Sequence, residues 1–325
     1  MQIYHHITDY KIEKPVLTIG SFDGVHLGHR KVIDKLKAIA QDKGGETVIF
    51  TFHPHPKVAL SSDEGKQELR MLTTIDERTR LFEQAGVDHL IIYPFTKEFA
   101  KLSYIDFVRT ILVEKLNVNT LVLGYDHRLG KDREGNFDTL LKLSVQYGFK
   151  LEKLDALFVD DNNVSSTKIR KALQAGKVQK AKRYLGYAYE LSGTVIKGKQ
   201  LGRKIQFPTA NIKLNDKLKL VPKDGVYIVE CSVMDKTYAA MLNIGTRPTV
   251  NNNLNNRSIE VHLLHFQADI YGQNISVKFI DRLRDEQKFN SIEELRQQLQ
   301  ADKNVVEKWL TVNESLNKDN LIEAD

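Results

Sequence analysis

Two histidines three residues apart are the feature of this sequence most suited to chemistry. His26 and His29, with Gly28 between them, lie in the segment 22–30, where a strand-like run gives way to a helical pattern. Backbone N–H groups and the helix dipole favour an anion at such a junction. Imidazoles there can donate hydrogen bonds to triphosphate oxygens and stabilise a leaving pyrophosphate. The pattern predicts nucleotide chemistry, above all nucleotidyl transfer, although two histidines at this spacing can also be ordinary surface residues.

Three further segments of the N-terminal half carry polar side chains that could join the histidines. They are Thr-Phe-His-Pro-His-Pro at 51–56, a glycine-rich and charged loop at 124–136, and Ser-Ser-Thr-Lys-Ile-Arg at 165–170. Hydroxyls and cations at the start of a helix suit a triphosphate, although the serines can equally be a plain N-cap. The histidines of 51–56 would share a strand face, but the proline between them and the lack of further ligands argue against zinc.

A second set of polar residues lies beyond residue 190 and suits phosphoryl transfer. The glycines of 193–203 would let backbone N–H groups approach phosphates closely, or form an ordinary hairpin. Thr209 and Asn211 offer hard oxygen ligands suited to Mg²⁺ on ATP phosphates. Glu260 stands on an alternating strand, where it can be a general base or an exposed strand residue.

Two later segments are less specific. Asn243 opens a polar loop, Asn-Ile-Gly-Thr-Arg-Pro-Thr, which can also be a simple turn before three asparagines. Arg284 and Glu286 precede a C-terminal helical pattern. They could hold the polar edge of a ring or cap that helix.

The polar segments of the N-terminal half lie between strand-like and helix-like runs that alternate along the chain. This alternation predicts a parallel sheet with helices on both faces, and ligands at the carboxyl ends of its strands. The expected strands are 15–22, 47–52, 87–93 and 120–125, and the expected helices are 29–43, 76–85 and 103–116.

The C-terminal half has a different texture. A helical stretch over 166–186 ends at Gly186, and short strand-like runs separated by turns follow. Such runs predict a small closed barrel, and Ser291 with Glu294 predicts the start of a C-terminal helix. The expected domains are 1–186 and 187–313, with a polar tail at 314–325. The expected strands of the barrel are 190–197, 225–233, 238–244, 258–266 and 275–282.

Composition sets the broad class of protein. The chain has 325 residues, 41% of them hydrophobic, and a net charge of +6, which suits about two domains and anionic substrates. No apolar run approaches the ~18 residues of a membrane helix, and the N-terminus lacks the pattern of a signal peptide. Cys231, the single cysteine, lies in an apolar run and fits a core position in a reducing cytoplasm. The lack of an RNP-like aromatic cluster argues against nucleic-acid binding.

The N-terminal segments together resemble the FMN adenylyltransferase module of prokaryotic bifunctional riboflavin kinase/FAD synthetases. The family motifs are G-x-F-D-G-x-H-x-G-H, a T-F-x-P-H-P-like turn, G-x-D-F-x-F-G-x-x-x-x-G-N and S-S-T-x-I-R. The resemblance implies that His26 and His29 bind ATP phosphates and that the turn His53, Pro54 and His55 lines the flavin end. It also assigns to ATP or its phosphates Gly20, Phe22, Asp23, Gly24, Gly28, Asp126, Ser165, Ser166, Thr167 and Arg170.

The C-terminal segments resemble the riboflavin kinase module of the same family. Its motifs are G-x-V-x-x-G-x-x-x-G-R, F-P-T-A-N, N-I-G-x-R-P-T, E-x-H and L-R-x-E-x-K-F. The resemblance implies a six-stranded barrel in which Thr209 and Asn211 take Mg·ATP and Glu260 deprotonates the terminal ribityl hydroxyl of riboflavin. It assigns ATP contacts to Gly193, Gly198, Gly202, Arg203, Thr209 and Asn243, and flavin contacts to Arg284 and Glu286.

The resulting hypothesis is an α/β protein with a Rossmann-like nucleotidyltransferase domain followed by a flavin-kinase barrel. The barrel would convert riboflavin and ATP to FMN and ADP, and the N-terminal domain would convert FMN and ATP to FAD and diphosphate, with Mg²⁺ in the cytoplasm. Two alternatives remain: a protein with one active module, the kinase, or a non-catalytic flavin- or RNA-binding regulator. Three positions depart from the motifs, namely His53, the stretch 127–129 and Gln206.

Overall fold

The protein was analysed as a computed structural model that describes most of the chain. The described residues are 1–7, 10–61, 69–124, 129–131, 134–155, 158–159, 162–198, 200, 202, 205–246 and 257–313. Contacts within the chain divide it into two compact units, Met1–Ser166 and Thr167–Asp325. Each unit is described by itself.

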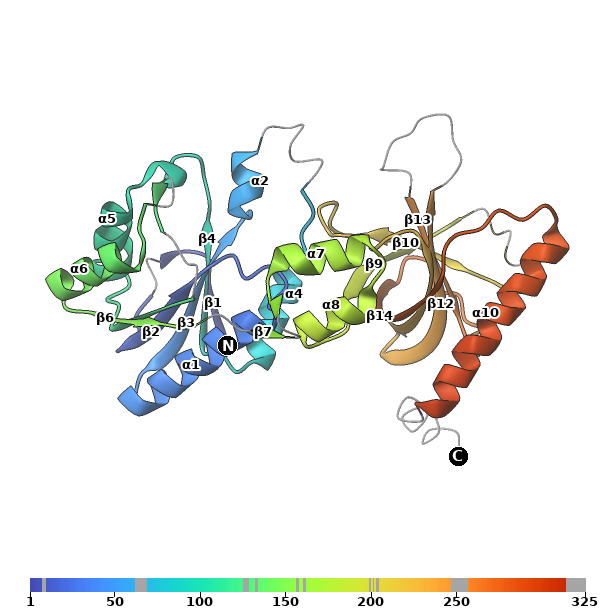
Figure 1. The fold of residues 1–325 in the computed structure, drawn as a ribbon, viewed down its shortest axis with the longest axis horizontal. Coiled ribbons are helices and arrows are strands. Elements are labelled where there is room, and N and C mark those ends of the chain that lie inside the picture. Colours follow the sequence, from blue (N-terminus) through green and yellow to red (C-terminus); the bar gives the residue numbers. More distant parts are fainter. Residues whose placement is uncertain are drawn as a thin grey trace. The chain divides into compact units, whose positions relative to one another are not determined.

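The N-terminal unit is built on a six-stranded parallel sheet (Figure 1). The strand order is β1-β4-β3-β2-β5-β6, and every neighbouring pair runs parallel. This arrangement confirms the α/β prediction. The strands are β1 (Gln2–Tyr4), β2 (Pro15–Ile19), β3 (Glu46–His53), β4 (His89–Pro94), β5 (Thr120–Leu123) and β6 (Lys150–Lys153).

Helices cover both faces of this sheet because its strands are apolar on both sides. In β3, Ile49 packs on one face with α1 (Leu27–Lys43) and α4 (Ile75–Gln84). Its neighbour Phe50 points the other way, as alternate strand residues must. It packs with the π-helical η3 (Phe107–Val113) and with α6 (Phe137–Tyr147).

The order of the strands creates a switch point at the centre of the sheet. β2 lies between β3 and β5, so the chain leaves β2 towards one side of the sheet and later returns to the other side. Ligands of such sheets bind outside the carboxyl ends of the strands at this point. The segment 20–26, which follows β2, therefore occupies the expected position for a ligand-binding loop.

Several sequence-based boundaries differ from the structure. The first helix begins at Leu27 rather than at 29, because His26 acts as its N-cap. The predicted helix over 103–116 is divided into the short α5 (Tyr104–Asp106) and η3. The elements β1, α6, β6 and β10 (Ala210–Leu214) were not predicted. α6 begins directly after the segment 124–136 that the sequence assigned to a nucleotide loop, and Asn136, the last residue of that segment, is its N-cap.

The C-terminal unit is a closed six-stranded antiparallel barrel, as the resemblance implied. Its strand order is β10-β13-β12-β11-β14-β9. Helix α10 (Ile292–Val312) packs on the outside, where Val306 meets Met241 and Ile228 (Figure 1). The remaining barrel strands are β9 (Glu190–Ile196), β11 (Gly225–Val233), β12 (Lys236–Thr246), β13 (Arg257–Leu263) and β14 (Asn274–Arg284).

Two basic helices, α7 (Ser166–Gln174) and α8 (Val178–Leu185), belong to the barrel unit by their contacts. The N–H of Lys223 donates to the carbonyl of Leu173 over 3.0 Å, and α8 packs on β14. Their contacts place the division of the chain at Ser166, whereas the composition of the sequence changes after Gly186. The functional domain boundary at 186/187 stays a prediction.

The remaining described elements are short. Among the described residues, no helix has both the length and the apolar character needed to cross a membrane. The short elements are α2 (Pro56–Leu60), η2 (Phe99–Lys101), β7 (Phe158–Val159) and β8 (Asn162–Asn163).

Cys231 gives a test of the barrel core. It is fully buried on β11, and burial raises the pKa of its thiol to about 12. Because the thiolate is the nucleophile, we expect the folded protein to react with Ellman's reagent at pH 8 only at the rate of barrel opening. Unfolding in guanidinium should release one reactive thiol per chain, which is the control. Fast stoichiometric labelling of the native protein would contradict the closed barrel.

Candidate functional site

The turn after β2 has an unusual backbone. Phe22 and Val25 adopt φ angles of 49° and 34°, a region that bulky side chains avoid and that persists only when the surroundings enforce it. Strain of this kind concentrates at functional sites. The turn leads directly into α1.

The side chain of Asp23 stabilises this turn through hydrogen bonds to the segment before α4. Its carboxylate, 2% exposed, accepts hydrogen bonds from the N–H groups of Leu72 (2.9 Å) and Thr73 (3.0 Å). The hydroxyl of Thr73 in turn accepts from the N–H of Gly24 (2.9 Å), and Ser166 Oγ donates to the carbonyl of Asp23 (2.8 Å). The Asp23 carboxylate thus binds backbone, and it holds the loop that the sequence associated with phosphate.

The two histidines lie face to face at the start of α1. Their rings are stacked with centroids 3.6 Å apart and planes 16° apart. Nδ1 of His26 accepts the N–H of His29 over 3.3 Å, so the proton of a neutral His26 ring sits on Nε2. A Cβ atom on Gly28 would lie 3.1 Å from Cε1 of His26, which explains why the motif has glycine between the histidines.

Arg78 is a buried cation beside this pair that the sequence analysis missed. It is 4% exposed on α4, and its Nη1 donates to the carbonyl of Ser21 over 2.6 Å. Burial lowers the pKa of His29 well below its ordinary value, and His26 and Arg78 lower it further. His29 is therefore neutral at pH 7. In the sequence Arg78 resembles any charged residue of an amphipathic helix, and only the fold reveals its burial.

These groups form a site suited to an anion. The helix N-terminus, two imidazoles and a guanidinium meet at the carboxyl end of β2, where oxyanions are favoured. Desolvation of His29 is offset most readily by a ligand that accepts its N–H or stabilises its charged form. The predicted histidine pair is therefore assembled by the fold into one constellation.

The other predicted residues of the N-terminal half fall in three places. His55 caps α2 by accepting the N–H of Lys57 (3.1 Å), and His53 and Pro54 are exposed at the carboxyl end of β3. Ser165 precedes α7. Thr167 and Arg170 lie within α7, in the second unit, and Asp126 lies outside the described residues.

Strand register brings the predicted kinase residues into one row on the barrel. Glu260 on β13 pairs with Asn211 on β10 and with Asn243 on β12. The row continues through Val226 of β11 to Arg284 of β14. Paired residues of neighbouring strands point to the same face. The barrel therefore gathers side chains that lie up to 73 positions apart in the sequence.

Three oxygen-bearing side chains surround the centre of this row. The hydroxyl of Thr209 lies 3.4 Å from Oε2 of Glu260, and Asn211 is 7% exposed beside it. A Cβ on Gly198 would overlap the Asn211 amide, so the backbone of Gly198 packs directly against this side chain of the row. Gly202 lies similarly against the carbonyl of Phe207. Gly193 lies within β9, where it pairs with Leu214 of β10. Arg203 lies outside the described part of the chain.

A cavity opens next to Thr209. It has a volume of about 530 Å³, and its walls come from the ends of β9 and β10 and from the turn that joins β13 to β14. Most of the lining residues are apolar, and Thr209, Gln267 and Asp269 add polar groups. The residues that line it are Val195, Pro208, Thr209, Ala210, Leu263, Phe266, Gln267, Ala268, Asp269, Ile270 and Tyr271.

Arg284 makes a structural contact that the sequence analysis did not predict. Its Nε and Nη2 donate to the carboxylate of Asp302 on α10, over 3.0 and 2.7 Å, and Asp302 also accepts from Gln298 (2.9 Å). Both ends of the pair are largely buried. The guanidinium thus anchors α10 to the barrel.

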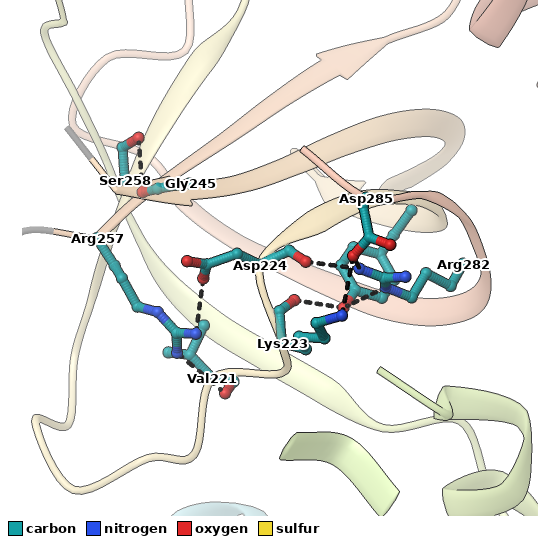
Figure 2. Close-up of polar contacts among 9 residues, drawn as sticks. Val221, Lys223, Asp224, Gly245, Arg257, Ser258, Arg282 and Asp285 are labelled. Atoms are coloured by element: carbon teal, nitrogen blue, oxygen red, sulfur yellow. Dashed lines mark hydrogen bonds and ion pairs between the residues drawn. The ribbon is translucent and has the colours of Figure 1, made fainter. Parts of the chain in front are cut away.

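A charged network joins several strand ends at one end of the barrel (Figure 2). Asp224 pairs through its carboxylate with Arg257 (2.6 Å) and through its carbonyl with Arg282 (2.7 Å). Arg282 and Lys223 bind Asp285 over 2.7 and 2.9 Å and lower its pKa to about 2. The network ties the start of β11 to the start of β13 and to the end of β14.

The carboxylate of Glu286 packs directly against Gly245. A Cβ atom added to Gly245 would overlap Oε1 of Glu286, so a side chain at this position would displace the carboxylate. Gly245 is held at the end of β12, where its carbonyl accepts from Ser258 over 3.4 Å (Figure 2). The two motifs N-I-G-x-R-P-T and L-R-x-E-x-K-F therefore meet at this end of the barrel.

The departure at Gln206 has a backbone explanation. Its φ angle is 66°, a value that glycine adopts without strain. The side chain is exposed, and its Oε1 accepts from Arg296 of α10 over 3.2 Å. Glutamine thus costs some backbone strain here and leaves Thr209 and Asn211 in place.

Comparisons with known proteins assign both units. A family model described as FAD synthetase matches residues 9–168, and one described as riboflavin kinase matches residues 185–310. A bifunctional riboflavin kinase/FMN adenylyltransferase of Bacillus subtilis is 38% identical over 301 residues, 92% of this chain and 93% of the relative. The protein of the same name in Escherichia coli K12 is 36% identical over 299 residues, with the same coverages.

One solved structure is similar over nearly the whole chain. It is described as a macrolide-efflux protein from Streptococcus pneumoniae, with a TM-score of 0.84 and 29% identity, covering 94% of this chain and 98% of that one. A shared fold does not carry a function by itself, whereas the family models address each unit separately.

The lowered pKa of His29 predicts a specific titration. We expect its ring nitrogens to keep the ¹⁵N shifts of a neutral imidazole as the pH falls through 6.5, its ordinary value. The unfolded chain takes up that proton and the folded chain does not, so α1 should lose stability as the pH falls through 6.5. Native-state hydrogen exchange of α1 amides measures this loss, and His29→Gln should reduce it. Imidazolium shifts at the ordinary pH would refute the burial of this ring.

The Arg284–Asp302 pair predicts a stability effect. Asp302→Ala leaves a buried guanidinium unpaired and should lower the free energy of unfolding of the barrel unit by about 3 kcal/mol. The single tryptophan, Trp309 of α10, reports this unfolding by fluorescence in urea. The matched control is Glu307→Ala, which removes a half-exposed pair with Lys303 at 3.6 Å and should cost less than about 1 kcal/mol. Equal effects of the two variants would argue against the anchor.

Proposed function

The chain belongs to the family of bifunctional riboflavin kinase/FMN adenylyltransferases, and we propose that its two sites divide the two reactions between them. The barrel converts riboflavin and ATP to FMN and ADP, and the N-terminal unit converts FMN and ATP to FAD and diphosphate. The order of the two family models along the chain agrees with this assignment. The observation that carries it is the pair of separate polar constellations, one around Glu260 and one around His26 and His29.

In the kinase reaction Glu260 is the general base. It takes the proton of the terminal ribityl hydroxyl while that oxygen attacks the γ-phosphorus of ATP, and the bond to the ADP oxygen breaks. Thr209, 3.4 Å from the Glu260 carboxylate, holds the phosphate end of ATP beside the base. Asn243 completes the row on the other side of Glu260.

We place Mg²⁺ at the same row. The hydroxyl of Thr209 and the amide oxygen of Asn211 are both hard oxygen ligands, which suit this cation. When bound, Mg²⁺ would neutralise charge on the ATP phosphates. Asn211 is buried, and its amide packs closely against Gly198, which restricts the movement of this side chain.

The cavity beside Thr209 is the proposed position of the ATP base. Its volume of about 530 Å³ lies within the range of small-molecule sites. Phe266, Ile270 and Tyr271 offer apolar surface for a purine ring, and Thr209 also lines the cavity. A nucleotide placed this way directs its phosphates towards Glu260.

The adenylyl transfer needs positioning and charge stabilisation. A phosphate oxygen of FMN attacks the α-phosphorus of ATP, and diphosphate leaves, so no proton has to be removed by the protein. Nε2–H of His26 and the ring of His29 are proposed to bind phosphate oxygens, with Arg78 supplying fixed positive charge. Asp23 keeps both histidines in place through the turn.

The remaining predicted residues keep the roles that the family resemblance implied. These are phosphate contacts for Gly20, Phe22, Gly24, Ser165, Ser166, Thr167 and Arg170, and flavin contacts for His53, Pro54, His55 and Glu286. The structural engagement of Arg284 with Asp302 leaves it at most an edge contact with the flavin. We also propose a cytoplasmic location, which suits a chain with one buried cysteine.

Two variants separate the two activities. With riboflavin, ATP and Mg²⁺, the wild type should form FMN first and FAD second, as followed by liquid chromatography. Glu260→Gln should lower the rate of FMN formation by at least about 10³-fold, yet still make FAD from supplied FMN. His29→Ala should do the reverse and accumulate FMN.

Each variant serves as the folding control of the other, because each keeps one activity in the same chain. Loss of both activities in either folded variant would overturn the two-site assignment. Wild-type protein that stops at FMN would leave only the barrel active. Wild-type protein that makes neither product would favour the non-catalytic regulator.

A further inference from the structure

A second polar residue of β13 lies next to the general base. His262 stands two positions after Glu260 and shares its strand face. Its register partner is Met241 of β12, and its ring contacts that of Phe207, with centroids 5.4 Å apart. This histidine is part of the motif E-x-H but has no role assigned from the sequence, and the proposed reaction does not use it.

The ring of His262 makes a short hydrogen bond to the chain. Its Nδ1 lies 2.7 Å from the carbonyl oxygen of Pro208. A carbonyl oxygen only accepts, so Nδ1 must carry the proton in either charge state of the ring. The donor is therefore fixed without any assumption about pH.

This contact gives a donor to a backbone carbonyl that lies before the first paired residue of β10. The register between β10 and β13 begins with Ala210 opposite Val261, and Pro208 lies just before it. Proline has no N–H and cannot continue a ladder. The side chain of His262 therefore holds the chain at Pro208, two residues before the first paired residue of β10.

Fixing that carbonyl also fixes Thr209. The peptide between Pro208 and Thr209 is planar, so the direction of its carbonyl sets the positions of the nitrogen and Cα of Thr209, from which the side chain extends. The hydroxyl of Thr209 in turn lies 3.4 Å from Glu260 Oε2. One strand thus carries both the base and the residue that orients its neighbour.

We propose that His262 is a positioning residue for phosphoryl transfer, which acts through the carbonyl of Pro208 to hold Thr209 beside Glu260. The inference rests on the proposed kinase function of this row. It assigns His262 no contact with substrate.

The alternative is a histidine that only fills space against Phe207. The two roles differ in which ring atom matters. Asparagine places an N–H donor where Nδ1 stands but loses most of the ring, whereas glutamine keeps more volume and places its donor farther out, near the position of Nε2. A positioning role therefore favours asparagine, and a packing role favours glutamine.

The test compares kinase kinetics of His262→Asn, His262→Gln and His262→Ala in the full chain. We expect kcat of FMN formation to fall about tenfold in the Gln and Ala variants, the scale of one hydrogen bond, with KM for riboflavin unchanged. His262→Asn should keep kcat near the wild-type value. FAD formation from supplied FMN should be unchanged in all three, since it uses the other unit.

A second measurement asks whether the effect passes through Thr209. In a Thr209→Val background, which should retain reduced but measurable activity, His262→Ala should cost little more, because the group that it orients is gone. The matched control is His265→Asn, the same chemical change three residues later, at an exposed position with a φ angle of 55° that asparagine tolerates. It should leave all rates unchanged.

Three outcomes would overturn the proposal: wild-type kcat in His262→Ala, a better rescue by glutamine than by asparagine, or full additivity with Thr209→Val. Thermal unfolding followed by Trp309 fluorescence identifies a variant that has lost its fold, and the Asn–Gln comparison remains decisive in that case. Failure of the proposed kinase function would appear separately, as Glu260→Gln with unchanged FMN formation.

Discussion

The buried carboxylate of Asp23 is the interaction on which the N-terminal site depends. Two bulky residues, Phe22 and Val25, occupy a left-handed region of the backbone, and hydrogen bonds from Leu72 and Thr73 to Asp23 hold the turn in that form. Only with this turn does His26 reach the N-cap of α1 and stack on His29. Asp23 thus holds the strained turn without having to touch the substrate, and the turn brings the two histidines together at the start of α1.

The barrel solves the same problem with strand register instead of a strained turn. A shift of one residue between neighbouring strands would move Asn211 or Asn243 to the opposite face from Glu260. Closure of the sheet opposes such shifts, because every strand is paired on both sides. The anchor between Arg284 and Asp302 then fixes α10 beside the row. Strand register thus positions Asn211, Glu260 and Asn243 on three neighbouring strands, and the backbone at Glu260 needs no strained conformation.

The sequence was sufficient to predict the architecture of both units. The alternation of strand-like and helix-like runs predicted the parallel sheet, and short strand-like runs with glycine-rich corners predicted the barrel. Arg78 and Asp302 could not be found this way, since a buried charged residue has the same letter as an exposed one. β1 was missed because three residues carry too little periodicity. Asp126 and Arg203 lie outside the described residues, and their roles stay predictions.

The motif residues fall into two groups that a pattern of letters does not separate. Asp23 and Arg284 have the side-chain chemistry of ligand-binding groups, yet their charged atoms are bound to Leu72 and Thr73 in one case and to Asp302 in the other. Glu260 stands in a row of oxygen donors with a cavity nearby. The difference lies in what each polar atom already binds, which follows from the fold. A motif therefore predicts where a reaction takes place more securely than which of its residues take part.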